Sequence, residues 1–359
     1  MDNFYEIDFL NVESKKSGDA ICLRYKTNGI QRIHVVDGGF QATGDKVVTH
    51  INQYYNAPTF IDSVVVTHPD GDHAGGLRKV LETYKVGELW MLRPWLYADE
   101  LIDRFKRLTS VENLKKRLKE LYPNLVALEE IADQKGIVIK EPFQGACIGN
   151  FTVMAPSKTR YLDLVVESEK TPEQYERADD VFSELFGLFN EAARSLKAVL
   201  WGEEKFSSEP TSAENEMSIV QYANLCDDKI LLTGDAGRDA LTEAADYAPN
   251  VDLVLPGIDQ FQVPHHGSRR NVSTELLDRW LGEKPFFQPS TDDTTFTAII
   301  SASKEDVHHP RKAVVRGMIH RKGKVISTEI GCIRTQNNAP AREGWTTVTP
   351  LDYPEEQED

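Results

Sequence analysis

Two histidines and two aspartates, His68, Asp70, Asp72 and His73, lie within the short sequence HPDGDH. Imidazole nitrogens and carboxylate oxygens are good ligands for hard or borderline divalent metals. The sequence follows the apolar run IDSVVV, which is typical of a buried strand, and it precedes a glycine turn and a helix expected over 77–84. Sites on open α/β sheets usually lie on such strand-to-helix loops. We therefore predict a metal site with these four side chains as ligands.

Three more candidate ligands follow later apolar segments. Asp235 ends the run KILLTGD, and His265 and His266 lie in the sequence PHHGS. If the aspartates of both regions meet in one pocket, their like charges are costly without cations, and a pair of divalent ions removes that cost. We expect Asp235 to bridge two ions about 3.5–4 Å apart, the usual spacing in two-metal hydrolases. The sequence leaves open which of His265 and His266 is a ligand.

Polar residues beside these motifs are candidates for handling a substrate. His309, or the second histidine of the HH pair, could protonate a leaving group, although the sequence HHP is also typical of a turn. Asn215 could offer its amide oxygen to a metal or cap a turn. The arginines next to PHHGS could grip a phosphate or lie on a solvated loop. The predicted substrate-binding residues are Asn215, Ser268, Arg269 and Arg270.

The chain has 359 residues and a formal net charge of −16. A uniformly acidic surface repels nucleic acid, so this charge argues against a general DNA-coating role. It does not exclude an enzyme that meets phosphate through metals and a local basic patch. Cations at 311–312, 316 and 321–322 form such a cluster in the sequence, and we expect a phosphodiester substrate to lie there.

Composition also indicates a cellular compartment. The four cysteines are far apart and form no C-x-x-C pair, which suits buried thiols in a reducing cytoplasm better than a disulfide framework. No apolar stretch approaches the roughly 18 residues that span a bilayer. The N-terminal residues MDNFYE lack the basic and apolar regions of a signal peptide. We therefore expect a cytoplasmic protein that does not enter a membrane.

The chain alternates between a β-rich pattern and charged helical segments. Strands are expected at 19–26, 32–36, 61–66, 88–92, 151–155, 217–222, 229–232, 251–255, 296–301 and 324–328. Segments 99–122 and 173–200 carry apolar residues at helical spacing, which predicts helical insertions at about 95–135 and 157–214. These apolar stripes either face the core or serve as a lid or partner-binding surface. The acidic tail 354–359 is expected to be solvated and disordered.

The motifs together resemble the metallo-β-lactamase fold. The usual loop of that fold is His-x-His-x-Asp-His, and here Asp70 stands where the second histidine is expected. This departure, with Asn215-x-x-Ser218 and the later TGD and PHHGS, looks like the branch found in ComEC-type DNA-uptake proteins. The resemblance covers about 1–92 and 215–335. It implies an α/β fold, a four-layer αββα sandwich, with one domain over 1–335 that carries the helical insertions, and a C-terminal extension over 336–359.

The resemblance also implies how the ligands divide between two ions. One ion would take His68, Asp70 and Asp235, and the other Asp72, His73, Asp235 and one of the two adjacent histidines. The mid-chain histidine ligand of the fold is missing, because no histidine occurs between His73 and His265. Oxygen-rich sites favour Mn²⁺ or Mg²⁺ more than histidine-rich ones do, so we expect two divalent ions that are either Zn²⁺ or Mn²⁺.

These expectations point to a metal-dependent hydrolase. The leading hypothesis is a phosphodiesterase or nuclease that acts on nucleic acid or a nucleotide through a metal-activated water, with Asp72 orienting the nucleophile. One alternative is a hydrolase of a carbon ester, lactam or thioester. Another is a non-catalytic scaffold, or an effector subunit of a multi-protein system, whose helical insertions dock a protein partner.

Overall fold

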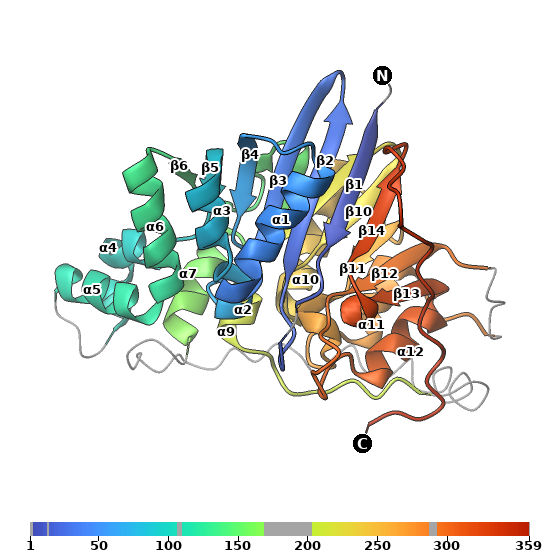
Figure 1. Ribbon diagram of the computed structural model, residues 1–359. Coiled ribbons are helices and arrows are strands. Elements are labelled where there is room, and N and C mark those ends of the chain that lie inside the picture. The colour runs from blue at the N-terminus through green and yellow to red at the C-terminus, as the bar shows by residue number, and fades with distance from the viewer. Residues whose placement is uncertain (1–2, 13, 106–109, 169–202, 287–292, 359) are drawn as a thin grey trace.

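The computed structural model describes residues 3–12, 14–105, 110–168, 203–286 and 293–358, and it contains two seven-stranded sheets (Figure 1). The first sheet has the order β14 (Ile333–Asn337), β1 (Phe4–Phe9), β2 (Ala20–Thr27), β3 (Ile30–Gly38), β4 (Phe60–Val65), β5 (Lys85–Trp90) and β6 (Val138–Lys140). The second has the order β13 (Gly323–Ser327), β12 (Phe296–Ile300), β11 (Gln260–Gln262), β10 (Asp228–Leu232), β9 (Val220–Leu225), β8 (Phe151–Ala155) and β7 (Cys147–Ile148).

The helices lie outside the sheets. Those of the first half of the chain are α1 (Gly44–Tyr54), α2 (Gly71–Ala74), α3 (Leu77–Thr83), α4 (Ala98–Leu101), α5 (Val111–Leu121), α6 (Pro123–Lys135) and α7 (Lys158–Glu167). Those of the second half are α9 (Ala213–Glu216), α10 (Arg238–Tyr247), α11 (Thr274–Leu281) and α12 (Lys312–His320). Short 3-10 turns are η1 (Gln41–Thr43), η2 (Pro94–Tyr97), η3 (Ile102–Arg104), η4 (Ala248–Val251), η5 (Pro264–Gly267) and η6 (Thr328–Ile330).

Three separate apolar layers hold four layers of structure together. One layer packs α1, α3 and α6 on the first sheet, a second lies between the two sheets, and a third packs α10, α11 and α12 on the second sheet. Side chains of β1 show how the period of two builds this arrangement: Tyr5, Ile7 and Phe9 enter the layer between the sheets. Glu6 and Asp8 face the other way. The structure thus confirms the predicted αββα sandwich.

The buried acids of β1 tie the C-terminal extension to the first sheet. Glu6 accepts hydrogen bonds from Arg24 and Arg334, and the Arg342 guanidinium donates to both Asp8 oxygens at 2.8 Å. Both carboxylates are fully buried, and their cation partners compensate the charge that burial would otherwise penalise. Residues 333–342 are therefore part of the packed fold.

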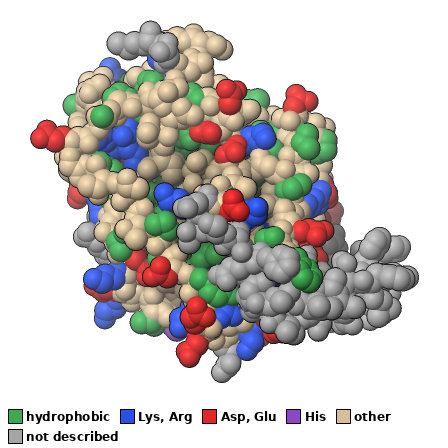
Figure 2. Space-filling view, turned by 90° about the vertical axis from the view of Figure 1, so that its right-hand side faces the viewer, with side chains coloured by type: hydrophobic (Ala, Val, Ile, Leu, Met, Phe, Trp, Pro, Cys, Tyr) green, Lys and Arg blue, Asp and Glu red, His purple; other side chains and the backbone are tan. Residues whose placement is uncertain are grey.

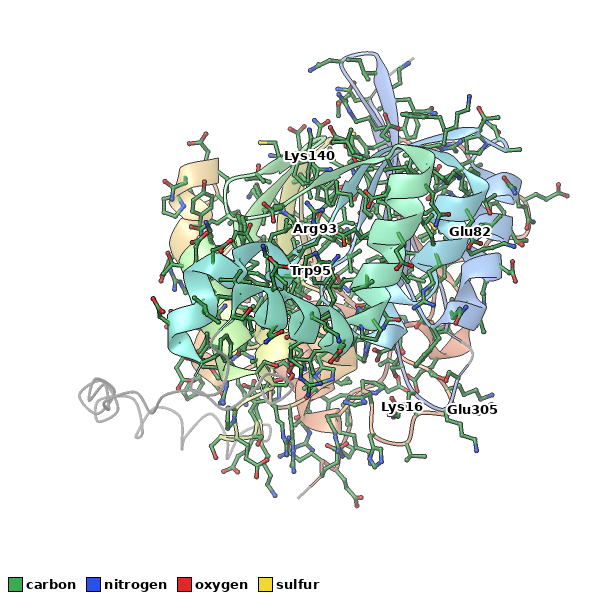
Figure 3. All side chains as sticks on the ribbon, turned by 90° about the vertical axis from the view of Figure 1, so that its left-hand side faces the viewer. Lys16, Glu82, Arg93, Trp95, Lys140 and Glu305 are labelled. Carbon is green, nitrogen blue, oxygen red and sulfur yellow. The ribbon has the colours of Figure 1, made fainter. Side chains whose placement is uncertain are left out.

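The helical insertion packs its apolar stripe inward. Leu101, Leu114 and Leu118 are fully buried in the same apolar layer as α1 and α3. Figure 3 shows Arg93 and Trp95 at the base of this insertion, where the buried Glu129 accepts hydrogen bonds from both. The core-facing interpretation of the stripe over 99–122 therefore holds for its described residues. The helix expected over 173–200 lies outside the described residues.

The strand expected over 251–255 is wrong. That segment begins in the turn η4 and continues without regular structure, whereas the strand of the sheet is β11, the polar sequence QFQ. The Gln262 side chain explains why a polar residue occupies a buried strand. Its amide oxygen accepts from the Thr233 N–H, and its amide nitrogen donates to Asp19.

The acidic tail and the basic cluster also differ from the sequence-based expectation, since they bind each other. Arg316 donates to the Pro354 and Glu355 carbonyls, and both Glu358 oxygens accept from the Lys312 N–H. Arg321 is buried, at 2% exposure, against acids of the chain itself. On the face viewed in Figure 2, acidic and basic side chains are interspersed. The Arg316 and Arg321 guanidiniums are therefore bound by groups of the chain itself, while the Lys312 side chain is exposed.

Within the described residues, every helix is too short or too polar to cross a lipid bilayer.

Glu204 anchors the segment that leads to α9. Its ionisation is expected to make the free energy of unfolding fall at acidic pH. It accepts hydrogen bonds from His320 Nδ1 at 2.6 Å and from Arg321 at 2.8 Å. Burial alone raises the pKa of Glu204, but the His320 hydrogen bond and the Arg321 charge outweigh it and lower the pKa to about 2 from 4.5. The stabilisation is present above the unfolded-state pKa and is lost as pH falls from about 4.5 towards 2. That shift corresponds to about 3 kcal/mol.

We therefore expect Glu204→Gln to lower the free energy of unfolding by about 3 kcal/mol at pH 7 and by progressively less below pH 4.5. Urea unfolding of the wild type and the variant between pH 7 and 2.5 measures this difference. Glu203→Gln is the matched control, because Glu203 precedes Glu204 in the chain and its side chain is exposed. A destabilisation of Glu204→Gln that stays constant across this pH range would contradict the assignment.

Candidate metal centre

All the candidate ligands come from one end of the two sheets. His68 to His73 follow β4, Asp235 follows β10, and His265 and His266 follow β11. Strands β3 to β5 pair in parallel, as do β10 and β11, so these segments leave their sheets at the same edge. The glycines after His73 allow the loop to approach closely, because a Cβ on Gly76 would lie 2.0 Å from the Gly38 carbonyl oxygen.

Asp235 lies at the centre of four imidazoles. Its Oδ1 is 3.2 Å from His73 Nε2 and 3.7 Å from His266 Nε2. Its Oδ2 is 3.7 Å from both His68 Nε2 and His265 Nε2. Two ligand atoms about 2.1 Å from one ion lie about 3.4 Å apart at a tetrahedral angle, so these separations fit shared ions. The carboxylate thus presents one oxygen to each of two pairs of histidines.

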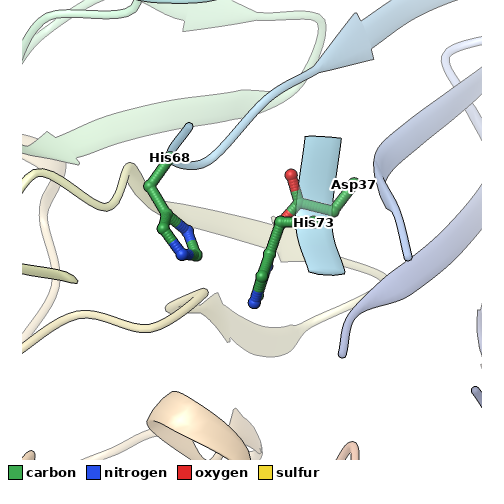
Figure 4. Close-up of side chains that lie close together, drawn as sticks. All are labelled: Asp37, His68 and His73. Atoms are coloured by element: carbon green, nitrogen blue, oxygen red, sulfur yellow. The ribbon is translucent and has the colours of Figure 1, made fainter. Parts of the chain in front are cut away.

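The hydrogen bonds behind the rings fix which nitrogen faces Asp235. His266 Nδ1 lies 2.8 Å from the Ser301 carbonyl, which can only accept, so Nδ1 carries the proton and Nε2 offers a lone pair. His73 Nδ1 donates to Asp37 Oδ2 at 2.8 Å. His68 Nδ1 lies 3.1 Å from Thr67 Oγ1, whose hydroxyl donates to Asp37. Figure 4 shows the rings of His68 and His73 pointing into the same space.

Asp37 is a functional residue that sequence reasoning missed. It ends β3, is fully buried, and accepts from the Thr67 N–H, the Thr67 hydroxyl and His73. Its backbone φ is +57°, an unusual value for a residue other than glycine. The only signal in the sequence is an acidic residue directly before two glycines at a strand end, and this pattern is common in turns.

The two remaining loop carboxylates lie at the edges of this cluster. Asp70 Oδ2 is 3.9 Å from His68 Nε2, and its side chain is about one-third exposed. Asp72, His73 and His266 each offer a ligand atom within 4.8 Å of the others. The helical insertion supports the loop, since Asn124 Nδ2 donates to the Pro69 carbonyl. The structure therefore brings together all seven residues predicted as metal ligands.

The buried atoms at the centre fit metal ions. Among the described residues, the Nε2 atoms of His68, His73 and His266 and Oδ1 of Asp235 are buried without a hydrogen-bond partner. Lone pairs on nitrogen that face carboxylate oxygens repel each other unless a cation lies between them. Nitrogen and oxygen donors of this kind suit Zn²⁺ or Mn²⁺.

Burial and nearby charges shift the pKa values of the centre's side chains in opposite directions. Burial lowers the pKa of His266 to about 3 and also lowers the pKa of His68, so both rings are neutral, as ligands must be. Burial alone lowers the pKa of His73, but the charges of Asp235 and Asp37 outweigh it and raise it. Burial raises the pKa of Asp19, a second buried acid beside His73 and Asp235, to about 7.

His309 lies beside the histidine pair. Its ring centroid is 5.5 Å from that of His265 and 6.1 Å from that of His266. The Asp306 carboxylate accepts from His309 Nδ1 at 3.1 Å and from the Ser17 hydroxyl at 2.8 Å. The loops on which these residues lie are therefore joined, and Figure 3 shows Lys16 and Glu305 of the same two loops close together. Asp306 is a second residue that sequence reasoning did not single out.

The four predicted substrate-binding residues differ in exposure and in their hydrogen-bond partners. Asn215 lies behind His265, with Nδ2 at 3.0 Å from Nδ1, and so it does not fill a ligand position. Ser268 is buried, and its hydroxyl accepts from the Arg270 N–H. Arg270 is exposed and pairs with Glu209, while Arg269 is half-buried and its carbonyl accepts from the Ser207 N–H. Of the four, Arg270 is the exposed one.

One segment of the chain is similar to a known protein family. Residues 35–115 match the sequence profile of the Metallo-beta-lactamase superfamily. This segment includes the end of β3, the strands β4 and β5, and the loop from His68 to His73. No curated protein matches the chain. Solved structures similar to it include a putative metallo-beta-lactamase from Thermotoga maritima, with 10% identity, a TM-score of 0.30, and coverage of 64% of this chain and 78% of that one. Another is metallo-beta-lactamase SMB-1 bound to 2-mercaptoethanesulfonate, with 9% identity, a TM-score of 0.30, and coverage of 70% and 78%.

The profile match covers residues 35–115, and the two-sheet sandwich around it is the α/β fold that the resemblance implies. The matched region holds the first half of the candidate centre. Asp235, His265 and His266 lie beyond it and join the centre through the fold.

Proposed function

We propose that this protein is a metal-dependent hydrolase whose substrate is a phosphodiester, in nucleic acid or in a nucleotide. The observation that carries the proposal is the position of Asp235, with each carboxylate oxygen facing two histidine nitrogens at 3.2–3.7 Å. Two-metal centres of this type activate water and neutralise charge on a phosphoryl group. The similarity of the motifs to ComEC-type proteins favours nucleic acid as the substrate class.

The residues around the centre have distinct roles in this proposal. His68, Asp70, Asp72, His73, Asp235 and the adjacent histidines hold the ions. Asp72 also orients the attacking water, because its carboxylate lies within reach of both His73 and His266. In its imidazolium form His309, held through Nδ1 by Asp306, would donate its Nε2 proton to the leaving oxygen, and burial lowers the pKa of this ring.

Charges near the centre favour an anionic substrate. The backbone at Gly18 touches Asp72, since a Cβ there would lie 2.6 Å from the Asp72 carbonyl oxygen. Lys15 and Lys16 precede it and are exposed, and Lys304 is exposed on the loop that Asp306 joins to them. Lys15, Lys16 and Lys304 therefore lie on two loops that adjoin the centre, in a chain whose net charge is −16.

Hydrolysis of bis-p-nitrophenyl phosphate tests this function. We expect the protein loaded with Mn²⁺ or Zn²⁺ to hydrolyse this diester, and Asp72→Asn to lose at least about 10²-fold in kcat, the range typical of losing a group that positions proton transfer. Asp99→Asn, an exposed carboxylate on α4, is the matched control and should retain full activity. A panel of single- and double-stranded DNA, RNA and cyclic dinucleotides then identifies the substrate class.

The same panel separates the competing functions. A chromogenic lactam, a thioester and a carboxylic ester are assayed beside the phosphodiesters. If the metal-loaded protein cleaves one of these and none of the phosphodiesters, the proposed substrate class is wrong. If the pure protein binds no metal, the protein is a scaffold rather than a hydrolase.

A further inference from the structure

Both members of the His265–His266 pair face Asp235, and the backbone is unusual where they do so. His265 has φ of +47° and His266 has φ of +55°. Two successive non-glycine residues in the left-handed region cost free energy, and such strain persists only where the surroundings hold it. Here the His265 N–H donates to the Gly234 carbonyl, and the His265 carbonyl accepts from Ser268.

This backbone directs the two rings to different oxygens of one carboxylate. The ring planes are 72° apart, with centroids 5.7 Å from each other. His265 Nε2 lies 3.7 Å from Asp235 Oδ2, the oxygen that His68 also faces. His266 Nε2 lies 3.7 Å from Oδ1, the oxygen that His73 also faces. Left-handed backbone at both residues would not be required if only one ring had to reach the centre.

Each ring is also anchored from behind by its own partner. Asn271 Nδ2 donates to the Asp235 and Ala236 carbonyls, which leaves its Oδ1 to accept from His265 Nδ1 at 3.0 Å. The Ser301 carbonyl accepts a hydrogen bond from His266 Nδ1 at 2.8 Å. A ligand histidine is commonly oriented in this way, with the other nitrogen donating to a fixed acceptor. His266 therefore presents a free lone pair on Nε2. Asn271 Oδ1 favours the same tautomer for His265, whose Nδ1 also lies 3.0 Å from Asn215 Nδ2.

We infer that the two adjacent histidines are divided between the two ions, an inference that rests on the two-ion centre of the proposed function. His265 completes the set of His68, Asp70 and Asp235 Oδ2. His266 completes the set of Asp72, His73 and Asp235 Oδ1. His265 thereby supplies the nitrogen that a mid-chain histidine would give, and no histidine occurs between positions 73 and 265 of the chain.

This division makes the two sites chemically alike. Apart from the buried Asp19, which lies beside His73 and Asp235, each set has two imidazole nitrogens and two carboxylate oxygens, one of them from Asp235. Sites with the same donor set have the same preference among divalent metals, so the two ions are expected to be of one kind and to bind with similar affinity. A centre with only one ligand from the pair would instead leave one site with a single imidazole and a weaker hold on its ion.

Metal counting tests the division directly. Asn is the replacement of choice, because it tolerates the left-handed backbone but its side chain is too short to place a ligand atom where Nε2 lies. In Mn²⁺ equilibrium dialysis we expect two ions per wild-type chain and about one per chain for both His265→Asn and His266→Asn. The affinity for the lost ion should fall by at least about 100-fold, the upper effect of losing an outer-shell partner.

Electron paramagnetic resonance of the Mn²⁺ protein gives a second readout. The spectrum of a coupled pair in the wild type should be replaced by that of an isolated ion in each variant. His308→Asn, an exposed histidine in a neighbouring loop, is the control and should keep both ions. Circular dichroism and thermal unfolding establish that each variant is folded before its ions are counted.

Other outcomes overturn the inference. If one variant keeps two ions at wild-type affinity, that histidine is not a ligand. If either variant loses both ions, the pair serves one shared site. The measurements use no substrate, so two ions in the wild type and one in each variant would support the division even if no phosphodiester is cleaved. In that case only the proposed function fails.

Discussion

Asp235→Asn is expected to remove both metal ions and nearly all hydrolytic activity. Asp235 is the residue whose two oxygens face all four imidazoles, and its side chain is only 4% exposed. The amide keeps one oxygen, loses the negative charge, and puts an NH₂ group against two histidine nitrogens. We expect metal content to fall from two ions to fewer than one per chain, and kcat/KM for a phosphodiester to fall by about 10³-fold or more.

The control for this variant is Asp239→Asn, an exposed aspartate in the first turn of α10. It carries the same chemical change close by in sequence and should leave the metal content and activity unchanged. Metal analysis after gel filtration, followed by diester hydrolysis with Mn²⁺ in excess, measures both effects. If Asp235→Asn retains two ions, the carboxylate does not bridge, and the centre is built on the loop aspartates instead.

The local half of this centre could be predicted from sequence, because its ligands are neighbours. His68 to His73 follow an apolar run and precede a glycine turn, so the chain itself dictates that they lie on one loop. Placing Asp235 and the histidine pair in the centre required a further inference. Residues that follow the carboxyl ends of parallel strands lie at the same edge of the sheet. The structure places Asp235 oxygens 3.2–3.7 Å from the His68 and His73 nitrogens and 3.7 Å from those of His265 and His266.

The supporting residues could not be predicted, because their roles depend on pairing between strands. Asp37 reaches Thr67 and His73 only because β3 pairs in parallel with β4. Asp306 reaches Ser17 across most of the chain length. Which nitrogen of each histidine faces the ions is likewise set by contacts such as the Ser301 carbonyl, which no local pattern encodes.

The errors in the sequence-based fold have a common cause. The segment 251–255 is mostly apolar like a buried strand but begins in a turn and continues without regular structure. The polar β11 is the strand instead, because Gln262 bonds across the sheet and to Asp19. Arg316 and Arg321 look like surface cations in sequence, yet the tail and Glu204 cover them. In each case tertiary hydrogen bonds satisfy a polar group that local composition places in solvent.

Asp37→Asn is expected to weaken metal binding although this carboxylate contacts no ion in the proposed centre. Asp37 Oδ2 accepts from His73 Nδ1 at 2.8 Å and, through the Thr67 hydroxyl, supports His68 as well. One buried acid therefore orients a ligand of each ion. An amide has one acceptor oxygen for three donors, so a ring loses its fixed orientation. Loss of such an outer-shell partner reduces metal affinity by about 10- to 100-fold.

Competition with a fluorescent chelator measures the affinity of the Asp37→Asn variant for each ion. Asp62→Asn is the matched control, because that aspartate also accepts a backbone N–H within the first sheet, from Ile33, but belongs to no part of the centre. Activity of Asp37→Asn should recover with excess Mn²⁺, since the ligands themselves remain. An unchanged affinity with a lower unfolding free energy would instead make Asp37 a purely structural residue, and the histidines would then hold their orientation without it.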